Sequence, residues 1–202
     1  MKERRQAGFC WALCCLVVVG MLFCQPVSVV KGQGHRDLGQ YVTGTVVNVG
    51  GGANGRTRPF TLIINRYTSP EDVQRLNSAL QSGGQDELLK VLSGMDAGRI
   101  QLGTGIGVTA NAIISTRQEG GTKLVVLYQR NLRISELRYG TRSEDYKFGY
   151  AELYFGGGGN EGMLIPAAKV RLKDGNTWEV EDFGTFPARL IGLQTRGGRR
   201  AR

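Results

Sequence analysis

Apolar and polar residues alternate with a period of two along much of this chain, and that pattern predicts a protein built mainly of β-strands. The runs 41–49 and 60–67 are rich in Val, Ile and Thr, and the glycine-rich segment 50–59 joins them as a long-loop hairpin. Further strands are predicted over 106–115, 123–130, 146–155 and 162–172. Residues 131–143 are polar and aperiodic, which predicts a loop.

Two of these runs also indicate which side chains enter the core. In the run 106–115, the alternating apolar positions predict one uninterrupted strand with a single core face, made of Ile106, Val108, Ala110, Ala112 and Ile114. Residues 124–127 are all apolar, which predicts a strand buried on both faces.

Between 69 and 93 the apolar period lengthens to that of a helix. Ser69 followed by Pro70 and two acidic residues is typical of a helix start. Gly83 and Gly84 predict its end, and a second short helix is expected from 85 to about 93. Because neither helix is long enough to be stable alone, we expect an αα-hairpin packed on the sheet.

A hairpin near the C-terminus has a register that the sequence selects. Slipping the register by one residue would turn every side chain to the opposite face. Only a three-residue loop, 174–176, pairs apolar residues with apolar ones and basic residues with acidic ones across the two strands. The predicted cross-strand pairs are Leu172 with Trp178, Val170 with Val180, Arg171 with Glu179, and Lys169 with Glu181.

The acidic residues of this hairpin are the densest candidate chemistry. Glu179 and Glu181 would share one face at roughly 7 Å, within reach of an acid–base pair. The predicted register gives each a cross-strand cation, so a structural role for the pairs is favoured. Glu152 is a third carboxylate open to a hydrolase role. Asp174 and Asn176 offer calcium ligands, but the spacing follows no established calcium loop, and we predict no metal.

Other catalytic arrangements are missing from the sequence. The glycines at 50–52 and 103–107 are followed by strands rather than by the helix N-terminus that binds phosphate. No serine stands in a Gly-x-Ser-x-Gly turn, and His35 is the one histidine of the chain. We therefore predict no catalytic residue and no cofactor.

Aromatic residues gather in the C-terminal half. Phe148, Tyr150 and Tyr154 share one face of the strand 146–155, and Trp178 follows in the hairpin. These four are candidate ligand-binding residues if that face lines a cavity for a small apolar ligand. Packing beneath the helices is the favoured alternative.

Residues 1–34 have the pattern of a signal peptide or an N-terminal anchor with a linker. Lys2 and two arginines precede a run of sixteen apolar residues, 9–24, which Gln25 and Pro26 end. Because a membrane span needs about 20 apolar residues, cleavage after Gly32 is favoured, while a retained anchor and lipid attachment at Cys24 stay open. All four cysteines lie in this segment, so the remainder has no thiol for a disulfide.

The charge of the chain is concentrated at its two ends. The net charge is +9, yet residues 35–195 hold 18 basic and 16 acidic side chains, and most of the excess lies in the leader and in the tail 196–202. With no basic stripe in the body, we expect no specific nucleic-acid partner. The tail is predicted to be disordered and could contact an anionic envelope component.

Four segments carry a resemblance to a known group. The runs 60–80 (FTLIINRYTSPEDVQRLNSAL), 142–155 (RSEDYKFGYAELYF), 162–169 (GMLIPAAK) and 186–190 (FPARL) resemble a set of predicted exported bacterial proteins of unknown function. In these proteins a strand leads into a short helical pair and then a β-rich C-terminal half. The similarity spans about 43–195 and implies this fold and export, but no catalytic or binding residue.

Together these patterns predict a single α+β domain over 35–195. Its core would be a largely antiparallel, curved sheet, as a half-barrel or sandwich, with a short αα-hairpin packed on it. We expect a periplasmic or secreted, non-catalytic protein that acts by binding or structural interaction in the envelope and meets the membrane only through an uncleaved leader. A small apolar-ligand carrier and a carboxylate-dependent hydrolase are the alternatives.

Overall fold

The computed structural model describes residues 39–47, 57–130, 145–157, 159–173, 177–182 and 187–197, all within the compact unit Gly32–Arg202. The predicted leader 1–34, the loop 131–143 and the hairpin loop 174–176 lie outside these ranges. Most of the loop predicted at 50–59 and of the tail 196–202 also lies outside them.

Within these ranges the chain forms ten strands and one helix, and every strand pairing is antiparallel. The elements are β1 (Gln40–Val47), β2 (Arg58–Ile64), α1 (Pro70–Ser93), β3 (Gly98–Leu102), β4 (Val108–Ala110), β5 (Ala112–Gln118), β6 (Gly121–Gln129), β7 (Phe148–Gly156), β8 (Glu161–Lys173), β9 (Thr177–Asp182) and β10 (Ala188–Arg196).

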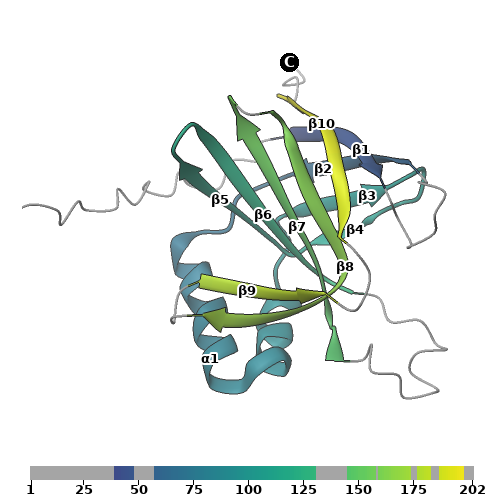
Figure 1. Cartoon of the computed structure of the whole chain (residues 1–202). Coiled ribbons are helices and arrows are strands. Elements are labelled where there is room, and N and C mark those ends of the chain that lie inside the picture. Colours follow the sequence, from purple (N-terminus) through teal and green to yellow (C-terminus); the bar gives the residue numbers. More distant parts are fainter. Residues whose placement is uncertain are drawn as a thin grey trace, which may run out of the picture. The chain divides into compact units, whose positions relative to one another are not determined.

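The strands form one sheet in the order β4-β3-β2-β1-β10-β8-β7-β6-β5, and β9 pairs with β8 beside this path (Figure 1). Its two outermost strands, β4 and β5, are consecutive in the chain and are separated by Asn111 alone. The sheet therefore curls into a nearly closed, barrel-like form. This confirms the predicted α+β class and the antiparallel, curved sheet.

Asn111 breaks the strand that the sequence predicted as continuous over 106–115. Its side chain is 6% exposed, donates to the carbonyl oxygen of Met95 at 3.0 Å and accepts from the backbone N–H of Gln129 at 2.8 Å. These two bonds hold the corner where β4 ends and β5 begins, which joins the two edges of the sheet.

The corner also shifts the alternation, so the predicted core face of 106–115 is wrong. Ala110 and Ile113, three positions apart, both belong to the cluster inside the sheet, whereas Ala112 joins a second cluster outside it. Ile106, which was expected in the core, is 84% exposed. A single residue that leaves the ladder between two strands is not evident from an alternating apolar pattern.

The inner cluster fills the concave side of the sheet. It takes buried residues from β1 to β8 and from β10, and only the inner face of a curled sheet brings so many strands together. Its largest fully buried members include Phe60, Leu62, Leu153, Leu164 and Leu190. The second cluster lies on the outer face, between α1 and the strands β6 to β8.

The structure has one helix, α1, in place of the predicted pair. Its start is as predicted, since the Ser69 hydroxyl accepts from the backbone N–H of Asp72 at 3.1 Å. Gly84 has φ 62° and ψ −144°, a conformation open essentially to glycine, and it kinks the helix rather than ending it. Gln85, just beyond the kink, exchanges two hydrogen bonds with the backbone of Val170 on β8.

β8 continues past β7 and pairs there with β9, forming an arm that lies against α1 (Figure 1). The predicted register is observed, with Leu172 opposite Trp178 and Val170 opposite Val180. Trp178 fixes the arm to the helix, because its indole N–H donates to Asn77 at 2.6 Å.

Candidate functional site

Three polar residues alternate along the outer face of β7. Leu153 points into the inner cluster, so the strand turns Tyr150, Glu152 and Tyr154 to the other side. The pairing of β6 with β7 places Lys123 opposite Tyr154 and Val125 opposite Glu152. Lys123 therefore reaches the carboxylate diagonally from the neighbouring strand.

These four side chains form one connected cluster, which we call the Glu152 cluster. Lys123 Nζ lies 2.7 Å from Glu152 Oε1 and 5.4 Å from the centre of the Tyr154 ring. The Tyr150 hydroxyl donates to Oε1 and the Tyr154 hydroxyl donates to Oε2. Glu152 is 7% exposed, and among the residues that the structure describes it is the one charged side chain that is buried.

The surroundings set the protonation states of the cluster. Burial raises the pKa of Glu152, but hydrogen bonds from Lys123 and both tyrosines outweigh it and hold that pKa below its usual value. Burial lowers the pKa of Lys123, and its contacts with Glu152 reverse this, so that pKa is raised. Burial and then the bond to Glu152 raise the pKa of Tyr150. At neutral pH the cluster is thus an ionised carboxylate held by one cation and two intact hydroxyls.

This arrangement is poor at acid–base chemistry. A general base works best with a pKa near the operating pH and needs a free lone pair aimed at its substrate. Glu152 has a lowered pKa, three groups already bond to its two oxygens, and its side chain is buried, so a substrate has little access to it. The cluster has a structural role on the outer face, because the hydrogen bond from Tyr154 to Glu152 fixes the position of the Tyr154 ring.

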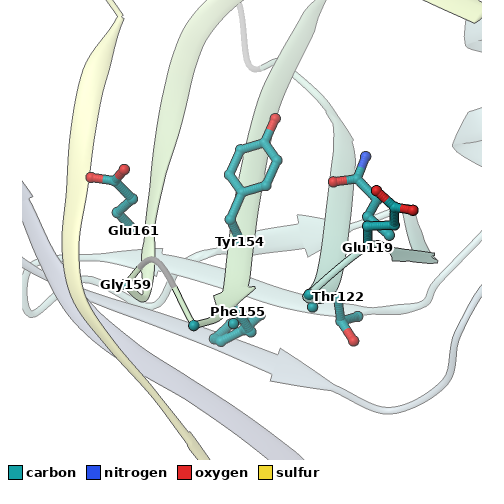
Figure 2. A pocket seen from close by; sticks show the side chains of 11 residues that line it. Glu119, Thr122, Tyr154, Phe155, Gly159 and Glu161 are labelled. Carbon is teal, nitrogen blue, oxygen red and sulfur yellow. The ribbon is translucent and has the colours of Figure 1, made fainter.

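Beside Tyr154 lies an open cleft of about 210 Å³, between the β5–β6 turn and the β7–β8 turn. Figure 2 shows the Tyr154 ring standing between Glu161 on one side and Glu119 on the other, while Phe155 projects from the opposite face of β7. Glu161 is paired with Arg189 of β10 at 3.6 Å. The cleft thus combines an aromatic ring, carboxylates and glycine-rich backbone at one end of the sheet.

The four aromatic residues predicted as ligand-binding candidates do not meet in this cleft. Tyr154 lines it. Phe148 is fully buried and Tyr150 is 3% exposed, and both pack in the outer cluster together with residues of α1. Trp178 lies half-buried on the β8–β9 arm, bonded to Asn77.

The charged pairs predicted on the β8–β9 arm lie opposite one another, Arg171 with Glu179 and Lys169 with Glu181. An ion pair at 2.8 Å runs diagonally, from Arg171 to Glu181, and Glu181 also accepts from the Tyr146 hydroxyl at 2.7 Å. Glu179 and Glu181 are both exposed.

Sequence reasoning missed the Glu152 cluster as a unit. The alternation Tyr150, Glu152, Tyr154 was a signal, because a carboxylate between two tyrosines on one strand face can accept from both. Lys123 carried no such signal, since its place depends on how β6 pairs with β7 across a segment of more than ten residues.

Within the described ranges, no group of three or more His, Cys, Asp or Glu side chains is arranged to hold a metal ion. No helix there has the length and apolarity needed to cross a membrane. The chain matches no family model, no curated protein and no solved structure.

Proposed function

We propose that this is an exported, non-catalytic protein that acts by binding or structural interaction in the cell envelope. The observation that carries the proposal is the state of Glu152, the one buried charge among the described residues. Both of its oxygens are engaged and its pKa is lowered, so it holds neighbouring groups in place rather than exchanging protons with a substrate. Export rests on the pattern of residues 1–34, a basic start and a short apolar run.

The two alternatives have less support. A carrier of small apolar ligands needs an apolar cavity, but the inner face of the sheet is packed with buried side chains, and Phe148 and Tyr150 pack in the cluster that includes α1. A hydrolase using Glu179 and Glu181 needs a sheltered pair, yet both residues are exposed and Glu181 is paired with Arg171.

The test has an export arm and a binding arm. N-terminal sequencing of the protein from culture fractions should give a start near Gln33 in the periplasmic or secreted fraction. Protein from that fraction should then be retained by isolated cell envelopes in a saturable manner. Recovery of the chain only in the cytoplasm, or envelope retention that does not saturate, would contradict the proposal.

A catalytic arm tests the role given to Glu152. In a broad hydrolase screen we expect no turnover by the wild type. Turnover that Glu152→Gln abolishes, and that the control Glu71→Gln, at an exposed carboxylate in the first turn of α1, leaves intact, would replace the proposed function by a carboxylate-dependent enzyme.

A further inference from the structure

Part of the lining of the cleft beside Tyr154 is formed by glycines, which expose their backbone without a side chain. Gly120 (φ 81°) and Gly159 (φ 118°) adopt conformations that favour glycine, so side chains are excluded there by backbone geometry. At Gly157, an added Cβ would meet no atom within 4 Å. A ligand in the cleft can therefore approach the peptide groups closely.

Two carboxylates, Glu119 and Glu161, line the cleft, and a third, Glu152, is bonded to the Tyr154 hydroxyl. Glu152 is paired with Lys123 at 2.7 Å, and Glu161 is paired with Arg189 at 3.6 Å. Glu119 leaves a negative charge on the lining, which repels an anionic ligand. The polar lining that remains also disfavours an apolar one, since burying unmatched polar groups costs free energy.

Aromatic and hydrogen-bonding groups meet at this position. The hydroxyl of Tyr154 is fixed on Glu152, which holds the ring upright at the cleft (Figure 2). Glu161 and Gln118 add a carboxylate and an amide to the lining, whereas Thr122 lies on the other face of the sheet with Phe155 (Figure 2). A pyranose ring has the matching chemistry, with C–H groups that stack on an aromatic ring and hydroxyls that both donate and accept.

The size of the cleft limits the ligand to one unit. Its volume of about 210 Å³ is below the roughly 300–1,000 Å³ of pockets for drug-sized ligands. The cleft is open to solvent, which leaves room for a chain to continue on either side. We infer that it binds one unit of a neutral polysaccharide, and this inference rests on the proposed binding function.

The experiment measures saccharide binding by the protein purified from the fraction in which it accumulates. The probes are maltohexaose, cellohexaose, xylohexaose and N-acetylchitohexaose, followed by saturation-transfer NMR and calorimetric titration. We expect at least one probe to bind, with NMR contacts concentrated on one sugar ring.

Two variants and a matched control locate the site. Gly157→Leu fills the cleft and should weaken binding at least tenfold. Gly105→Leu introduces the same side chain at another open glycine, in the β3–β4 turn at the opposite end of the β4–β5 segment, and should change nothing. If Gly157→Leu fails to fold, Glu161→Gln replaces it, since it removes an exposed charged acceptor and should weaken binding about threefold to tenfold.

Binding of none of the four probes would overturn the inference, and so would equal binding by wild type and by the folded cleft variant. Binding of a small amine such as putrescine in place of the saccharides would overturn the ligand class. If saccharides fail while saturable envelope retention persists, only the ligand class is refuted. Loss of that retention as well would refute the proposed function itself.

Discussion

Replacing Asn111 tests whether its side chain closes the sheet. Asn111→Ala removes the bonds to the Met95 carbonyl and to the Gln129 N–H. Each neutral hydrogen bond contributes about 0.5–1.5 kcal/mol net, so the expected loss is about 2 kcal/mol of unfolding free energy. Since small domains have a stability of roughly 5–15 kcal/mol, urea unfolding monitored by tryptophan fluorescence should resolve the change easily.

Asn111→Asp makes the test sharper. The new carboxylate can still accept from Gln129, but it cannot donate to Met95, and it places a charge at a position that is 6% exposed. We expect a larger loss than for Asn111→Ala at pH 7. Burial should raise the folded pKa of the new carboxyl above about 3.9, its unfolded value.

The sign of the pH dependence follows from that shift. The penalty is fully present above the folded pKa and vanishes below the unfolded pKa, where the protonated carboxyl can donate to Met95. The stability gap between this variant and the wild type should therefore narrow from pH 7 to pH 4. A variant as stable as the wild type at pH 7, or a gap that widens in acid, would refute the role given to Asn111.

Three further changes test the packing and the cluster. Gly149→Ala should cost about 3 kcal/mol, because its Cβ would lie 2.0 Å from the Tyr128 ring; in a Tyr128→Ala background the same change should cost almost nothing in urea unfolding. Gly84→Ala meets no atom within 4 Å, so its expected loss of about 2 kcal/mol in thermal unfolding reflects backbone strain alone. Glu152→Gln should be less stable than the wild type at pH 7. Because the folded pKa of Glu152 is lowered, its contribution is present above about pH 4.3 and is lost as the pH falls through the folded pKa, so the two urea-unfolding curves should converge in acid.

The predictable parts of the fold are those that depend on neighbours in sequence. The β8–β9 register followed from residues on either side of one short loop, since a slip would have exposed Trp178 and Val180 on the wrong face. The start of α1 followed from Ser69 and the proline after it.

What the sequence concealed depends on contacts between distant segments. At Gly84 the backbone leaves helical geometry, and Gln85 just beyond this kink binds Val170 on β8, 85 positions away. Asn111 looked like one polar position among many, and its two partners lie 16 and 18 positions away. The Glu152 cluster likewise depends on the pairing of β6 with β7, which places Lys123 next to Glu152 and cannot be seen in the sequence of either strand alone.

The pairing of the first strand with the last has a kinetic consequence. Tyr41 on β1 lies opposite Arg196 on β10, so this pairing in the middle of the sheet joins residues almost the whole length of the domain apart. Such a contact imposes a high loop-closure entropy and slow folding, typically in milliseconds to seconds for β-rich domains. During synthesis β1 cannot form this pairing until β10 has left the ribosome, so the full sheet forms only after synthesis of the domain is complete.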